Sequence, residues 1–196
     1  MKLPKFINST GFAILGLMAA LAVADPAGAM SGGHGEAPAG VALDPLFKLT
    51  THNRGSLTQA DLRRKPFVVV FGYTNCADVC PTTLFNASNL LGGLGEEGNR
   101  LPVLFVTVDP ERDTPETLKD YLESFDPRII GLSGTREQIK AVEAAFEAPL
   151  RKDPDNSGRS HSSAFFLMDK FGLLAAPIDY TEPAKIETMA KRLLKQ

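Results

Sequence analysis

The sequence predicts an α/β domain in which a central mixed β-sheet is flanked by helices. Two short, continuous apolar runs, residues 67–71 and 103–108, each follow a proline and are typical of buried, parallel strands. Segments with helical spacing alternate with these runs, which is the order of an α/β fold. The chain has 196 residues, 43% of them hydrophobic, so one core can hold the domain without a metal or a disulfide.

Helix signals follow each of the two strands. Residues 81–91 begin with a proline in the first helical turn and end at a Gly-Gly pair, as helices commonly do. A second helix begins at residues 114–116 and must stop near Asp126, which precedes a proline. Thr135 and Gln138 form a predicted capping box at the start of a third helix.

The C-terminal third of the chain adds strands and one more helix. Residues 128–132 are predicted as a short strand, and residues 163–168 and 173–178 as the two strands of a β-hairpin that turns at Gly172. Apolar residues from Ile186 onwards recur at the spacing of an amphipathic helix. The complete order is that of a thioredoxin-like α/β sandwich with an extended β-hairpin.

The N-terminus differs in composition from the rest of the chain. Residues 1–24 combine a basic start with an uncharged run over residues 12–24, the pattern of an export signal, with an uncleaved membrane anchor as the alternative. Residues 25–42 are rich in Gly, Ala and Pro and are predicted to form a flexible linker. The folded domain is therefore expected over residues 43–196, in the periplasm or anchored to the inner membrane facing it.

The charge of the chain excludes a nucleic-acid-binding surface. Its 21 basic and 23 acidic residues leave a formal net charge of −2, and no basic run is longer than residues 63–65. Export to an oxidising compartment allows two thiols to pair as a disulfide, unless a metal or a reductant holds them.

The two cysteines, Cys76 and Cys80, lie where a buried strand ends and a helix begins. Amides and the helix dipole at that position favour the thiolate, most strongly for Cys80 beside Pro81, although Asp78 opposes this. A disulfide across such a short loop contributes only about 2 kcal/mol, so a purely structural role is disfavoured. The pair is expected to do redox or metal chemistry.

Five motifs resemble the SCO/SenC family of thioredoxin-fold copper chaperones, which serve cytochrome oxidase assembly. They are residues 71–74 with 76–81, 108–115, 125–128, 131–134 and 161–166. The resemblance implies that Cys76, Cys80 and His161 bind one copper ion. The chain departs from the family at Ala77, where a proline is usual, and at Ser160, where an aspartate is frequent.

The chemistry of these residues agrees with the resemblance. Two thiolates and one imidazole are a soft donor set that suits Cu(I) and can also hold Cu(II). Asp109 ends the second buried strand and is our candidate for supporting a ligand, or alternatively for fixing the turn at Pro110, with Asp113 and Thr114 capping the next helix. His52 is expected to be exposed in a turn.

The resemblance implies a copper-binding chaperone that delivers copper, or reducing equivalents, to the binuclear copper site of cytochrome c oxidase. This role does not require catalytic turnover. Its partners would be the copper-site subunit and another periplasmic copper donor or thiol reductant. The alternative is a thiol-disulfide oxidoreductase acting on the cysteines of that subunit, which needs Cys76 and Cys80 but not His161. A peroxidase is disfavoured because Tyr73 and Ala77 replace the Pro and Thr of the peroxiredoxin pattern.

Overall fold

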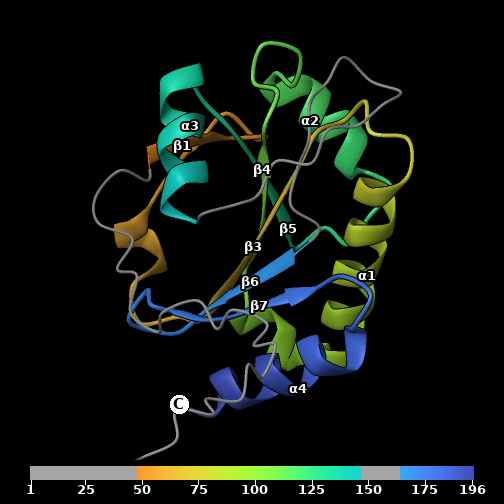
Figure 1. The fold of residues 1–196 in the computed structure, drawn as a ribbon, viewed down its shortest axis with the longest axis vertical. Helices are drawn as coiled ribbons and strands as arrows, with labels where there is room; N and C mark the ends of the chain where they lie inside the picture. Colours follow the sequence, from red (N-terminus) through yellow and green to blue (C-terminus); the bar gives the residue numbers. More distant parts are fainter. Residues whose placement is uncertain (1–47, 147–163) are drawn as a thin grey trace, which may run out of the picture. The chain divides into compact units, whose positions relative to one another are not determined.

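A computed structural model describes residues 48–146 and 164–196 (Figure 1). The predicted signal and linker, over residues 1–42, lie outside the described residues, and so does His161. The elements, in chain order, are β1 (Lys48–Thr51), β2 (Ser56–Thr58), the short 3-10 helix η1 (Gln59–Leu62), β3 (Phe67–Gly72), α1 (Val79–Leu94), the 3-10 helix η2 (Gly95–Arg100), β4 (Val103–Thr107), α2 (Pro115–Leu122), β5 (Ile129–Ser133), α3 (Arg136–Ala145), β6 (Ala164–Met168), β7 (Leu174–Asp179) and α4 (Pro183–Leu194).

The strands form one mixed sheet in the order β2-β1-β5-β4-β3-β6-β7. Strands β3, β4 and β5 are parallel, as predicted for the apolar runs, and the β6–β7 hairpin and β1 join them antiparallel. Gly72 pairs with Thr107, so the C-terminal ends of β3 and β4 meet at one edge of the sheet. The predicted α/β fold class is confirmed.

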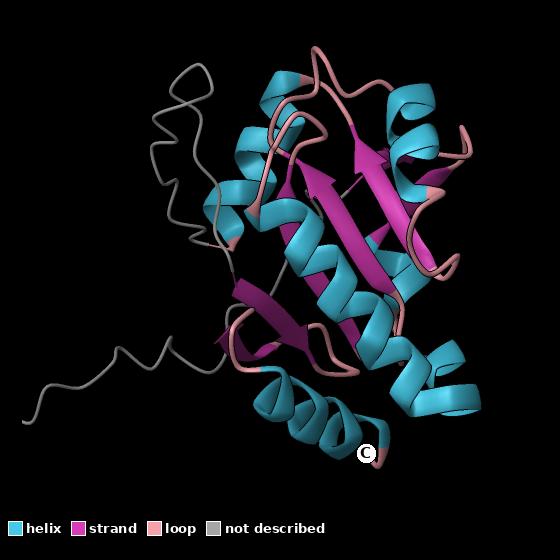
Figure 2. Cartoon of the chain, turned by 90° about the vertical axis from the view of Figure 1, so that its right-hand side faces the viewer, coloured by secondary structure: helices cyan, strands magenta, loops and turns pink. Residues whose placement is uncertain are grey.

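Helices cover both faces of the sheet, and β3 is buried on both. Val68 and Val70 pack into the cluster that α1, α2 and α4 cover, whereas Val69 and Phe71 pack into the cluster that α3 covers. Figure 1 shows α3 and α1 on opposite sides of the strands, and Figure 2 shows α1 crossing in front of them. Burial on both faces explains why these strands are continuous apolar runs without alternation.

The helix starts follow the local sequence closely. Thr135 and Gln138 form the predicted capping box of α3, and the Thr114 hydroxyl accepts a hydrogen bond from the Thr117 amide at the start of α2. Helix α1 begins at Val79, earlier than the prediction, so Cys80 lies in its first turn. No helix in residues 48–146 or 164–196 is long and apolar enough to cross a membrane.

The edge hairpin β1–β2 was not predicted, and it corrects the expectation for His52. This side chain is half-buried rather than exposed, and its Nδ1 accepts a hydrogen bond from the Gly131 amide at 3.0 Å. The His52 amide in turn donates to the Gly131 carbonyl at 2.8 Å. His52 is therefore a link between the hairpin turn and β5.

Candidate metal centre

The two cysteines are brought together at the C-terminal edge of the sheet. Cys76 lies in the loop after β3, and Cys80 in the first turn of α1, so the chain turns back on itself between them. The two sulfurs are not joined in a disulfide, and both residues are buried, with 6% and 1% of their surface exposed. Two sulfur donors shielded from water at the end of a central strand are well placed to share a soft metal ion.

The backbone at the start of α1 interacts with Cys76 rather than with Cys80. The Cys80 amide donates a hydrogen bond to the Cys76 sulfur at 3.3 Å, while the Asp78 side chain makes no capping bond. The pKa of the Cys80 thiol is raised far above its ordinary range, first by a hydrogen bond with the Cys76 side chain and then by burial. The expectation that Cys80 favours the thiolate most strongly was therefore wrong, because burial and the neighbouring Cys76 disfavour its charged form and the helix amide points at the other sulfur.

A glycine makes room for the Cys80 sulfur. A Cβ atom placed on Gly72 would lie 2.8 Å from the Cys80 Sγ atom and 2.6 Å from the ring of Phe105. Both distances are well inside van der Waals contact, so only glycine fits between them. Tyr73, which follows, is fully buried in the same cluster as the two cysteines. The pair is thus held against rigid neighbours.

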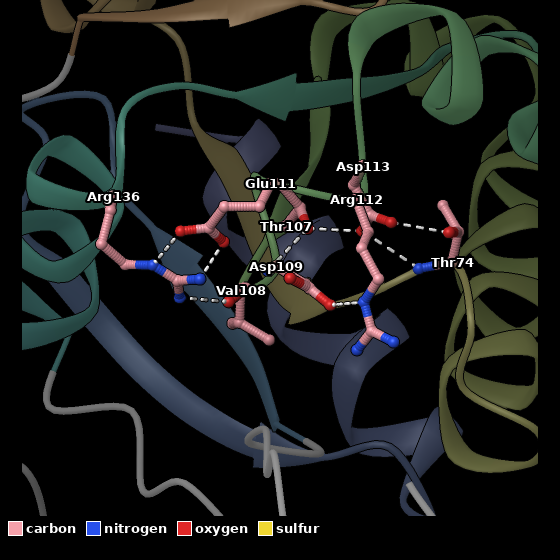
Figure 3. A network of polar contacts seen from close by, with 8 residues as sticks. All are labelled: Thr74, Thr107, Val108, Asp109, Glu111, Arg112, Asp113 and Arg136. Carbon is pink, nitrogen blue, oxygen red and sulfur yellow. Dashed lines mark hydrogen bonds and ion pairs between the residues drawn. The ribbon is translucent and has the colours of Figure 1, made fainter. Parts of the chain in front are cut away.

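The loop between β4 and α2 binds the cysteine loop through Asp113 (Figure 3). The Asp113 carboxylate accepts hydrogen bonds from the Thr74 amide at 3.1 Å and the Thr74 hydroxyl at 2.6 Å, and from the Thr107 hydroxyl at 2.5 Å. Thr114 alone caps α2 with its side chain, so the capping role expected for Asp113 was wrong. Sequence reasoning missed this contact because Thr74 and Asp113 are 39 positions apart.

Asp109 is almost completely buried in the same loop. Its carboxylate forms an ion pair with Arg112, its amide donates to the Thr107 hydroxyl at 2.9 Å, and its carbonyl accepts from the Arg112 and Asp113 amides. These contacts support the turn-forming role that the sequence offered for Asp109. Its role beside a metal ligand stays a prediction, since His161 lies outside the described residues.

A further ion pair ties this loop to α3. Arg136, the first residue of α3, binds Glu111 through both carboxylate oxygens and donates to the Val108 carbonyl at 3.4 Å (Figure 3). Across residues 48–146 and 164–196, no three His, Cys, Asp or Glu side chains gather closely enough to hold a metal ion. Within those ranges the two thiols are the soft side chains that lie close together, and their softness and position would suit copper.

Comparison with known proteins supplies the family. The SCO1/SenC family model matches residues 36–196. The mitochondrial protein SCO2 of Saccharomyces cerevisiae is 33% identical over 161 residues, which cover 78% of this chain but only 54% of the yeast protein. The chain thus spans about half the length of that relative.

Solved structures agree with the family match. ScoI of Bradyrhizobium japonicum, solved with copper bound, is 38% identical with a TM-score of 0.69 over 80% of this chain and 99% of that one. BsSco, a member of the Sco family of cytochrome c oxidase assembly proteins, is 21% identical and shares the fold, with a TM-score of 0.67 over 79% of this chain and 94% of its own. By its sequence match and its fold, this chain belongs to the SCO1/SenC family.

Proposed function

We propose that this chain is a copper-binding assembly factor that delivers copper for the binuclear copper site of cytochrome c oxidase. The observation that carries the proposal is the pair of buried thiols, Cys76 and Cys80, which are held together by the hydrogen bond from the Cys80 amide to the Cys76 sulfur at the C-terminal edge of the sheet. A solved structure of 38% identity, ScoI of Bradyrhizobium japonicum, has copper bound, which supports the same cargo here.

Three residues would hold one copper ion: Cys76, Cys80 and His161. Copper entering the site displaces the thiol protons, so both sulfurs bind as thiolates and binding weakens as the pH falls. The soft sulfur pair favours Cu(I), and the imidazole completes a three-coordinate set that also accepts Cu(II). The proposed set of three protein ligands leaves a position that a partner's ligand can take, which is what transfer requires.

Copper titration of the reduced protein tests this ligand set. Wild type should bind one copper tightly, Cys76→Ser and Cys80→Ser should abolish tight binding, and His161→Ala should weaken it on the order of tenfold or more. His52→Ala is the matched control, because this histidine binds the Gly131 backbone instead. Equal titration of wild type and His161→Ala would refute the three-ligand site.

Bound copper and a disulfide exclude each other in this proposal, because both use the same two sulfur atoms. The oxidised protein should not load copper, and bound copper should protect the thiols from oxidation. Counting free thiols and bound metal on the same sample, before and after reduction, measures both. Tight stoichiometric copper on the fully oxidised protein contradicts the proposal.

A second candidate function is reduction of a partner's disulfide. The hydrogen bond from the Cys80 amide to the Cys76 sulfur favours attack by Cys76, after which Cys80 completes the exchange. The two thiols then become a disulfide as the partner's disulfide gains two electrons and two protons. This activity needs no histidine, so a His161→Ala variant that binds no copper but still supports assembly of the copper site would favour the reductase.

The site of action belongs to the same proposal. Residues 1–24 would direct export, residues 25–42 would act as a linker, and residues 43–196 would work in the periplasm, free or held at the inner membrane. A chain in that location can meet the copper-site subunit, a copper donor and a thiol reductant. Mass spectrometry of the protein recovered from the periplasm and from membranes identifies the mature N-terminus and tests the assignment.

A further inference from the structure

The Asp113 carboxylate makes an unusually complete set of contacts for a residue in a connecting loop. Only 1% of its surface is exposed, and it accepts three hydrogen bonds, two from Thr74 and one from Thr107. Hydrogen bonds to an ionised carboxylate are roughly twice as strong as those between neutral groups. The contact between the two loops is therefore strong and shielded from water.

The backbone around Asp113 is fixed independently of its side chain. Its amide donates to the Asp109 carbonyl at 2.9 Å, and its own carbonyl accepts from the Ser133 hydroxyl at 2.9 Å. The adjacent Thr114 caps α2. The carboxylate is thus presented from a rigid turn, and it is not needed to begin the helix.

Thr74 transmits this rigidity to the cysteines. It stands two positions before Cys76, in the segment that leaves β3 at Gly72 and enters α1 at Val79. Within that segment, the Cys76 amide donates to the Tyr73 carbonyl at a long 3.3 Å. The Thr74 hydroxyl bond to Asp113 is shorter, at 2.6 Å, and both bonds from Thr74 end on a carboxylate, so they restrain the segment that carries Cys76.

We propose that Asp113 is a positioning residue for the Cys76 and Cys80 pair and acts through Thr74 (Figure 3). By fixing the loop, it holds the two sulfurs close together for sharing an ion or forming a disulfide. The copper part of this inference rests on the proposed function. The effect on disulfide formation does not, because it depends on the geometry of the pair alone.

Two variants at the contact and their combination test the inference. Asp113→Asn keeps the shape but loses the charge, and Thr74→Val loses the hydroxyl. In each folded variant we expect the equilibrium constant for disulfide formation against glutathione to fall about tenfold, which raises the midpoint potential by about 30 mV. In the double variant this equilibrium constant should fall by less than the two single fold-changes multiplied together, because both substitutions break the same contact. Thr74→Ser should restore the wild-type value.

Thr114→Ala is the matched structural control. It removes the cap of α2 one residue away from Asp113 and should lower stability without moving the midpoint potential. The inference would be overturned if Asp113→Asn and Thr74→Val had the wild-type midpoint potential. It would also be overturned if the fold-changes of the two single variants multiplied in the double variant, because the two residues would then act independently. Copper titration of the wild type is a separate measurement. If the wild type binds no copper, the proposed function fails, but the midpoint potentials of the variants still decide whether Asp113 positions the cysteine pair.

Discussion

Substituting Gly72 by alanine tests the packing at the cysteine pair directly. The new methyl group would lie 2.8 Å from the Cys80 sulfur, and 2.6 Å and 3.0 Å from two atoms of the Phe105 ring. Neither neighbour can swing into solvent, because each is 1% exposed. Overpacking of this kind lowers the free energy of unfolding by about 2–3 kcal/mol. Alanine also makes the unfolded chain less flexible than glycine does, which raises the free energy of unfolding by about 0.5–1 kcal/mol. We therefore expect a net loss of about 1–2.5 kcal/mol in the free energy of unfolding.

The assay is urea unfolding of the reduced protein, with disulfide formation measured on the same samples. Gly92→Ala is the matched control, since a Cβ there meets nothing within 4 Å and the residue lies inside α1. The free energy of unfolding of Gly92→Ala should be higher than that of the wild type by about 0.5–1 kcal/mol. Gly72→Ala should also form its disulfide less readily, because the methyl group displaces the Cys80 sulfur. Unfolding at the wild-type urea concentration, with normal disulfide formation, would refute the packing described for Cys80.

Two further predictions concern buried groups that titrate. The Tyr121 hydroxyl is buried and has no hydrogen-bond partner among the described residues, so Tyr121→Phe should leave stability unchanged or raise it by up to about 2 kcal/mol. A fall of more than about 1 kcal/mol in the free energy of unfolding, measured by thermal or urea unfolding, would contradict this prediction. Because the pKa of Cys80 is raised in the folded chain, the unfolded chain loses this proton at a lower pH than the folded chain does. The free energy of unfolding of the reduced protein should therefore fall as the pH rises above about 8.5, by up to about 1.4 kcal/mol per pH unit. Cys80→Ser should lack this part of the pH dependence, and identical profiles for the two proteins would show that Cys80 ionises freely.

The sequence by itself determined the features that depend on neighbouring residues. The strands β3 and β4 were predicted from continuous apolar runs, because burial on both faces leaves no polar positions. The capping box at Thr135 was predicted because it needs only residues three apart. The placement of Cys76 and Cys80 at a strand end and a helix start was likewise a local property.

Only the tertiary structure decided the contacts between distant segments. The hairpin β1–β2 escaped prediction because its strands are short and mostly polar on the exposed side, and pairing with β5 holds it in place. His52 acquires its partner through that pairing. The state of the Cys80 thiol also depended on packing, since the helix amide reaches the other sulfur. The link from Asp113 to Thr74 exists because parallel strands bring their C-terminal ends to one edge of the sheet, however far apart they lie in the chain.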